Sequence, residues 1–199
     1  LYQSMQERYE LQRRYMHDYK NQLICIWGML SEGKNEETIC YTENLLGSIQ
    51  KSAFIVDTNH VAVNIVLNQK YQYAKDRGIT MILEVNDLSK LVMSDQDIVI
   101  ILVNLLDNAI EACEKLDKDK IIKMKLVLEE KELIISVKNP VKEPIRIRDN
   151  IVITTKKDKI SHGIGLSNVK LIVEREEGII ALKYDDGWFY VSAVIPVDK

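Results

Sequence analysis

An apolar stripe with coiled-coil spacing runs through the first thirty residues of the chain. Its members follow one another at alternating steps of four and three: Met5, Tyr9, Gln12, Met16, Tyr19, Leu23, Ile26 and Leu30. Such a seam predicts a helix that packs against other helices, with Gln12 as its one polar break. Loop-forming residues at 31–35 then interrupt the pattern.

A second stripe follows this loop at the same three/four spacing. It consists of Ile39, Thr42, Leu46, Ile49 and Ala53. Two helices joined by a short loop make a helical hairpin, and a lone hairpin cannot bury both of its faces. We therefore expect residues 1–55 to form a dimerisation hairpin, which builds a four-helix bundle from two copies of the chain.

Helical and strand patterns alternate in the remaining residues, 56–199. Helices are predicted over 62–75, which Gly78 ends, over 95–115, which the capping-box spacing of 94–97 opens, and over 166–176. Strands are predicted over 79–85, 121–129, 132–138, 179–184 and 188–195. The stretch 140–162 has no sustained periodicity and is predicted to be a functional loop. This pattern predicts an α+β domain with a mostly antiparallel sheet.

Composition places the chain among ordinary soluble proteins. The 199 residues are 46% hydrophobic and 29% charged, which suits one large domain or two small ones. A net charge of −3 offers no basic footprint, so we predict no direct nucleic-acid partner. Cys25, Cys40 and Cys113 lack metal-ligand spacing and are interpreted as reduced intracellular thiols.

Neither a membrane span nor a signal peptide is predicted. The longest apolar stretches, 23–30 and 98–106, are far shorter than the ~18 residues that a span needs. Because the sequence starts at Leu1 and not at Met, we expect it to be a piece of a longer protein. The missing span therefore says little about the parent molecule.

His17 is the first candidate for chemistry. Met16 occupies an a position, so His17 is a b position that faces solvent beside the seam. Asp18 can orient or take a proton from the imidazole, and Asn21, one turn on, can orient a water. A His-Asp pair is common by chance, however, and taken alone it favours a surface histidine without function.

Two amides mark the middle of the predicted long helix. Asn104 and Asn108 are four residues apart and share a face. Amides on an apolar helix are costly to bury without partners, and an amide oxygen suits a hard cation such as Mg²⁺. The alternative is a pair of polar residues exposed on an amphipathic helix.

Glycines then precede the last predicted helix. Gly163 and Gly165 form a G-x-G turn, whose backbone N–H groups can approach a phosphate at the helix N-terminus. The turn lacks the third glycine of a dinucleotide fingerprint and is no Walker A loop, so a flexible loop remains an alternative. Asn139, which ends a strand, is either an adenine contact or a strand-ending turn.

The order and spacing of these motifs resemble bacterial histidine kinases of the gyrase–chaperone–kinase–MutL (GHKL) ATPase superfamily. Residues 15–23 (YMHDYKNQL) look like the H-box of the peptide-sensing quorum kinases of Gram-positive bacteria. Residues 104–112 (NLLDNAIEA) look like the N-box, and 162–169 (HGIGLSNV) look like the G-box. Residues 64–78 are similar to the helix that opens the catalytic domain of that subfamily.

The resemblance implies a fold and roles for particular residues. The second domain, 56–199, would be a Bergerat-type α/β sandwich that binds ATP. His17 would be the phospho-acceptor and Asp18 its general base, and Asp18 with Asn21 would match the spacing linked to phosphatase activity. Asn108 would bind Mg²⁺, and Asn104 would assist at the phosphates. The lid over the phosphates would be framed by Gly163, Gly165 and Leu166, with Thr155, Lys156 and Lys157 upstream in it.

Three departures from the wider family stand out. Asn139 stands where most histidine kinases carry the adenine-binding Asp of a D-x-G-x-G box, a departure for which the quorum subfamily is known. Glu111 replaces a basic or aromatic residue, which makes Lys156 or Lys157 the candidate for neutralising phosphate charge. Hydrolytic relatives carry a water-activating Glu where this chain has Asn104, and an amide cannot act as a base, which favours transfer to a protein nucleophile.

The predicted function is ATP-dependent autophosphorylation of His17 and phosphotransfer to a response regulator, which the resemblance implies is of the LytTR type. The full-length protein would carry a membrane sensor domain, with this fragment on the cytoplasmic face of the cell membrane. One alternative is a dimerisation and signalling module that binds nucleotide weakly or not at all. Another, a GHKL ATPase or anti-sigma-type serine kinase, would have no need of the helical hairpin.

Overall fold

The chain divides into two compact units. The computed structural model describes residues 2–46, 55–148, 151–153 and 162–197. One unit spans residues 1–51 and the other 52–199. Each unit is considered by itself below.

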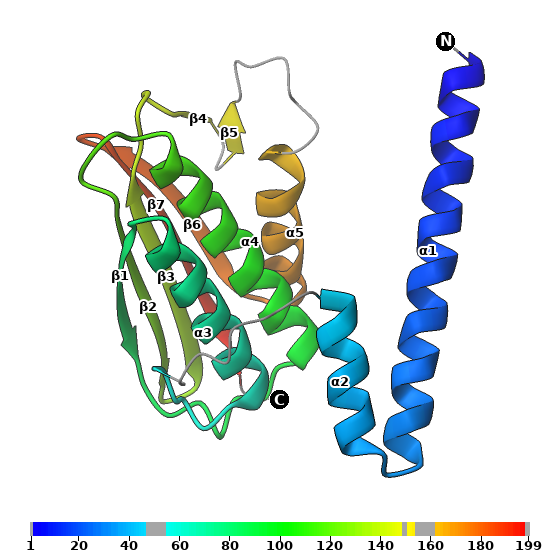
Figure 1. Cartoon of the computed structure of the whole chain (residues 1–199). Helices are drawn as coiled ribbons and strands as arrows, with labels where there is room; N and C mark the ends of the chain where they lie inside the picture. The colour runs from blue at the N-terminus through cyan, green and yellow to red at the C-terminus, as the bar shows by residue number, and fades with distance from the viewer. Residues whose placement is uncertain (1, 47–54, 149–150, 154–161, 198–199) are drawn as a thin grey trace. The chain divides into compact units, whose positions relative to one another are not determined.

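The first unit consists of two helices joined by a tight turn. Helix α1 spans Tyr2–Ser31 and helix α2 spans Asn35–Leu46 (Figure 1). Gly33, with φ of +73°, closes the turn, in which Lys34 N donates to Met29 O at 3.0 Å. Ile49 and Ala53 of the second predicted stripe lie outside the described residues. No described helix is both long enough and apolar enough to cross a membrane.

The second unit is built on a five-stranded sheet in the order β1-β2-β3-β7-β6. The strands are β1 (Thr80–Val85), β2 (Ile121–Glu129), β3 (Glu132–Pro140), β6 (Ile179–Asp185) and β7 (Trp188–Pro196). Only β1 and β2 are parallel, which confirms the prediction of a mostly antiparallel sheet. Asp186 and Gly187, both with positive φ, make the tight turn between β6 and β7 that an Asp-Gly pair favours.

Three helices cover one face of this sheet: α3 (Val61–Asp76), α4 (Asp95–Glu114) and α5 (His162–Arg175) (Figure 1). Alternate β3 residues, Leu133, Ile135 and Val137, are buried against the helices. The apolar face of α4 packs against this side of the sheet. Ser94 caps α4 as predicted, because its hydroxyl accepts from Asp97 N at 3.1 Å.

The structure corrects the prediction for residues 140–162. Part of this stretch forms a two-stranded hairpin of β4 (Arg146–Arg148) and β5 (Ile151–Ile153). Strands of three residues are too short to produce a recognisable alternation, so periodicity could not reveal them. Helix α5 also begins at His162, four residues earlier than predicted, because the glycines of its first turn have poor helix propensity and hide its start.

Candidate functional site

The candidate site centres on the face of α4 that is turned toward α5. Two side chains of α4 reach α5: Asp97 pairs with Arg175 at 2.6 Å, and Asn104 lies against Gly165. Asn108 is one turn beyond Asn104 and therefore lies on the same face. The N-terminal turn of α5 and the middle of α4 thus meet where the sequence placed two separate motifs.

Gly165 is required at this meeting point. A Cβ atom built on Gly165 would come within 2.7 Å of Asn104 Oδ1, which is closer than non-bonded atoms approach. The Asn104 amide cannot turn away without loss, because its Nδ2 donates to Ile100 O at 2.7 Å. The second glycine of the predicted G-x-G pair therefore allows close approach of the two helices. It lies within α5 and not in a turn that precedes it.

Asn108 carries an unused hydrogen-bonding group. Its Nδ2 is buried and has no hydrogen-bond partner among the described residues. Buried polar groups are nearly always hydrogen-bonded. An unpaired Asn108 Nδ2, one helical turn from the contact between Asn104 and Gly165, therefore fits a site that binds a polar ligand. The amide oxygen of the same side chain suits Mg²⁺, which takes oxygen ligands and retains waters. Among the described residues, no group of three or more His, Cys, Asp or Glu side chains could hold a metal alone.

Asn139 is buried near the end of β3, on the same face of the sheet as Val137. Its side chain is 3% exposed, and its Nδ2 donates to Pro140 O at 3.0 Å. A buried amide at a strand end has the hydrogen-bonding groups that a planar base needs. One of its donors is already engaged by the backbone.

Several predicted lid residues cannot be placed. Thr155, Lys156 and Lys157 lie outside the described residues. Gly163 lies in the first turn of α5, and Leu166, one residue after Gly165, is partly buried against the core. The structure therefore brings together Asn104, Asn108 and Gly165, and it leaves the proposed phosphate-neutralising lysines untested.

An ion pair ties the start of α4 to the end of α5. Arg175 Nη2 lies 2.6 Å from Asp97 Oδ2, and Ser94 Oγ donates to the same oxygen at 2.6 Å. The hydrogen bonds from Arg175 and Ser94 lower the pKa of the Asp97 carboxyl below its usual value. This pair fixes the spacing of the two helices between which the site lies.

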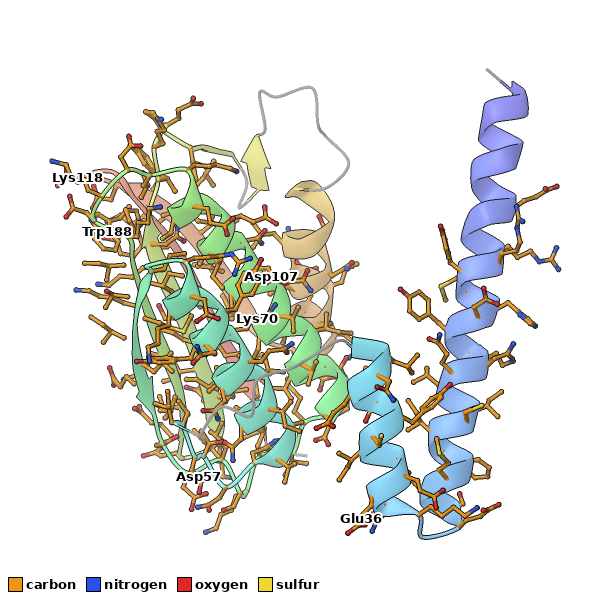
Figure 2. All side chains as sticks on the ribbon, in the orientation of Figure 1. Glu36, Asp57, Lys70, Asp107, Lys118 and Trp188 are labelled. Carbon is orange, nitrogen blue, oxygen red and sulfur yellow. The ribbon has the colours of Figure 1, made fainter. Side chains whose placement is uncertain are left out.

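A cavity of about 360 Å³ lies between α4 and α3. Lys70 of α3 pairs with Asp107 of α4 there, at 2.5 Å, and Figure 2 labels both residues. Glu111 also lines this cavity. Neither Asn104 nor Asn108 lines the cavity, but Glu111 is seven residues after Asn104 and three after Asn108, so the cavity reaches the face of α4 that carries these two amides. Sequence patterns gave no signal for the Lys70–Asp107 pair, which joins residues 37 positions apart.

A polar clamp that sequence reasoning also missed holds the segment before α3. Asn68 is 8% exposed, and its oxygen accepts from Ile55 N at 2.6 Å and from Val56 N at 3.0 Å. Its Nδ2 donates to Val56 O and Asn64 O, each at 2.8 Å. Asn64 in turn accepts from both the backbone N–H and the hydroxyl of Thr58. The first described residues of the second unit, from Ile55 on, are thereby fixed to α3.

His17 is exposed in the helical unit. Its side chain is 71% exposed, as a b position predicts. Asn21 Nδ2 lies 3.2 Å from His17 Nδ1, and Asp18 Oδ1 lies 3.6 Å from the same nitrogen. Both predicted neighbours therefore face Nδ1 of the imidazole.

A mixed sheet with three helices on one face, and an amide-bearing helix against a glycine-rich helix start, defines an ATP-binding domain of the type found in histidine kinases. A family model described as the GHKL domain matches residues 93–196, more than half of the chain. The chain belongs to this family. A comparison with curated proteins found no match.

Solved structures of histidine kinases share the fold. The catalytic domain of histidine kinase ThkA is 19% identical with a TM-score of 0.54, and the match covers 73% of this chain and 97% of that one. The Acinetobacter baumannii histidine kinase AdeS is 14% identical with a TM-score of 0.53, covering 92% and 98%. The mycobacterial sensor histidine kinase MprB is 15% identical with a TM-score of 0.51, covering 67% and 93%.

Proposed function

We propose that this chain is the kinase core of a two-component system, which phosphorylates its own His17 from ATP and passes the phosphoryl group to a response regulator. The observation that carries the proposal is the meeting of Asn104 with Gly165 beside the orphan amide of Asn108. Membership of the GHKL family and the histidine-kinase fold of its structural neighbours support it.

Asn108 and Asn104 would hold the nucleotide phosphates, with Asn108 contributing an amide oxygen to Mg²⁺. Bound Mg²⁺ would neutralise phosphate charge as it develops during transfer. Gly165 would allow the phosphates to approach the N-terminal turn of α5, where unpaired N–H groups favour anions. Lys156 and Lys157 remain candidates for further charge neutralisation, Thr155 for the lid, and Asn139 for the adenine.

His17 would act through Nε2. Two groups compete for Nδ1: Asn21 Nδ2, a donor at 3.2 Å, would keep Nδ1 unprotonated, whereas Asp18, at 3.6 Å, would accept a proton from Nδ1. Attack through Nε2 needs the second arrangement, in which the Nε2 lone pair is available. Nε2 attacks the γ-phosphorus, the bond from that phosphorus to the ADP oxygen breaks, and Asp18 accepts the Nδ1 proton. Asn104 stands where a base would activate water, and its amide cannot do so. Asp18 and Asn21 would also serve a phosphatase reaction on the regulator.

The helical unit would supply the homodimer. Its seam residues Met16, Tyr19 and Leu23 are 63%, 63% and 65% exposed. A contiguous apolar stripe of this kind is stable in water only when another helix covers it. A second copy would complete a four-helix bundle. By resemblance, the regulator is of the LytTR type, and the parent protein is a membrane sensor of the quorum-kinase kind with this core on the cytoplasmic face.

Incubation with Mg²⁺ and ATP labelled at the γ-phosphate tests the proposal. We expect acid-labile label on the wild-type chain and none on His17→Gln. His60→Asn is the matched control: it removes another histidine, keeps a helix-capping side chain before α3, and should retain the label. Acid-stable label, or label that survives His17→Gln, would overturn the assignment.

One observation favours a second candidate function, a signalling module of the same fold that binds nucleotide weakly or not at all. Asn139 replaces the expected aspartate, and one of its donors is already engaged by Pro140 O. Calorimetric titration with a non-hydrolysable ATP analogue and Mg²⁺ distinguishes the two. Absence of binding at millimolar nucleotide would favour the module, and saturable binding would favour the kinase.

A further inference from the structure

The face of the sheet that lies away from the three helices carries an ordered array of lysines. Lys123 of β2 is paired in register with Lys138 of β3, Lys138 with Tyr190 of β7, and Tyr190 with Lys183 of β6. These four residues, the lysine row, cross four neighbouring strands in one line. Their sequence neighbours Val137, Phe189 and Val191 are buried toward the helices, so the lysine row faces outward.

This arrangement carries an electrostatic cost. Like charges directly opposite on neighbouring strands destabilise a sheet, and Lys123 lies directly opposite Lys138. Among the described residues, no carboxylate lies within ion-pair distance of either ammonium, whereas Lys183 pairs with Asp185 at 2.8 Å. In the next row, Lys125 is neutralised by Glu84 at 3.0 Å and by Glu129 at 3.6 Å. Lys123 and Lys138 are therefore the two lysines of the row whose charge no carboxylate among the described residues neutralises, on a chain whose net charge is −3.

Aromatic rings hold the ammonium groups in place. Lys138 and Lys183 lie 5.7 and 5.9 Å from the centre of the Tyr190 ring, and Lys123 lies 5.9 Å from that of Trp188. Because two lysines already lie over Tyr190, that ring is poorly placed to stack on a nucleic-acid base. Ile82, which pairs in register with Lys123, is 50% exposed and extends the face with apolar surface.

We propose that this face docks on an anionic phospholipid surface. The row crosses four strands of the sheet, which gives a bilayer a broad surface, whereas a helix or a peptide docks in a groove. Lysines attract anionic headgroups, and Trp and Tyr rings are the side chains that favour the headgroup level of a membrane. In the next row the hydroxyls of Ser136 and Ser192 hydrogen-bond to each other at 3.1 Å, which leaves one of the two O–H groups to donate to a phosphate oxygen.

Vesicle sedimentation with the full chain tests the proposal. We expect binding to vesicles of equal parts phosphatidylglycerol and phosphatidylcholine, no binding to pure phosphatidylcholine, and weakening with added salt. The triple variant Lys123→Gln, Lys138→Gln, Lys183→Gln should lose roughly 25-fold in partitioning, on the basis of about a fivefold contribution from each of Lys123 and Lys138, because Lys183 is already paired with Asp185. The matched control Lys75→Gln, Lys90→Gln, Lys170→Gln makes the same change in net charge outside the sheet and should keep most of the binding.

Four outcomes would overturn the proposal. The first is wild-type chain that ignores anionic vesicles, and the second is equal loss in the two triple variants. The third is wild-type chain that binds a single-stranded thymidine oligomer but not vesicles, which would assign the face to nucleic acid. A triple variant that changes only the oligomeric state, measured by sedimentation without vesicles, assigns the face to a second copy and also contradicts the proposal. Melting curves of both triple variants verify that each is folded.

Discussion

The two units of this chain differ in where their large apolar side chains lie: the second unit buries them, and the helical unit exposes them. In the part of the chain that the structure describes, every buried apolar side chain belongs to the second unit, from Val56 to Ile195. The helical unit instead exposes large apolar groups, with Leu23 at 65% and Trp27 at 71%. One unit therefore carries its own core, and the other has its apolar surface available for another chain.

The same contrast separates the candidate chemistry. Asn104, Asn108 and Gly165 depend on close packing between two helices of the second unit, where a displacement of a few tenths of an ångström matters. His17 depends only on residues within one turn of its own helix and on exposure to solvent. The nucleotide side of the proposed reaction is thus sensitive to packing, whereas the acceptor side is sensitive to access.

The largest expected effect comes from removing core volume in α4. Leu102 is fully buried, so Leu102→Ala leaves a cavity and should lower the free energy of unfolding of the second unit by about 3 kcal/mol. Leu23→Ala makes the same change in the helical unit. It should leave the free energy of unfolding of the second unit unchanged but weaken self-association of the chain. Chemical denaturation and sedimentation measure the two effects. Equal loss of unfolding free energy in both variants would contradict the contrast between the units.

The next effect concerns the clamp that holds the start of the second unit. Asn68→Ala removes the partner of Ile55 N, Val56 N and Val56 O, and should cost about 2 kcal/mol in unfolding free energy. Hydrogen exchange at the Ile55 and Val56 amides should accelerate. Asn86→Ala is the matched control, because that exposed amide bonds Leu128 N and O away from this segment. Exchange that rises equally at Ile55 in both variants would show that the clamp is not local.

A smaller effect on stability, but a specific one on ligand binding, is expected at Gly165. In Gly165→Ala the new Cβ must displace the Asn104 amide, so affinity for Mg²⁺ and an ATP analogue should fall about tenfold, or about 1.4 kcal/mol. Stability should change little, because alanine gains up to about 1 kcal/mol in helix propensity and offsets the contact. Gly28→Ala, where a Cβ would meet nothing within 4 Å, is the matched control in α1. Titration calorimetry measures the affinity, and unchanged binding in Gly165→Ala would remove Gly165 from the site.

Local signals predicted most elements of the second unit. The alternation in β7, the cap at Ser94 and the stop at Gly78 each leave a pattern within a few residues. The candidate site was predicted as separate motifs only, because the contact between Asn104 and Gly165 spans 61 residues and has no periodic signature. The Asn68 clamp was missed for a related reason. The Asn68 amide bonds only to backbone groups, which are the same in every residue and therefore leave no pattern in the sequence.

The smallest expected effect is the pH dependence of the ion pair that joins α4 to α5. Arg175 and Ser94 lower the pKa of Asp97, so the ionised carboxylate stabilises the folded state. That contribution is complete above the ordinary pKa of 3.8 and is lost as the pH falls through the lower folded value. Arg175 is 57% exposed, so solvent screens the pair and its contribution to the free energy of unfolding stays below the losses expected for Leu102→Ala and Asn68→Ala.

Asp97→Asn should therefore melt below wild type at neutral pH, and the gap should close as the pH falls below the folded pKa of Asp97. Thermal melts of the two proteins across this range measure the difference. Arg175→Gln should reproduce the loss, and the double variant should add little to either single change, because each removes the same interaction. A gap that persists unchanged at low pH would show that Asp97 contributes through packing and not through its charge, and the spacing of the two helices around Asn104 would then need another cause.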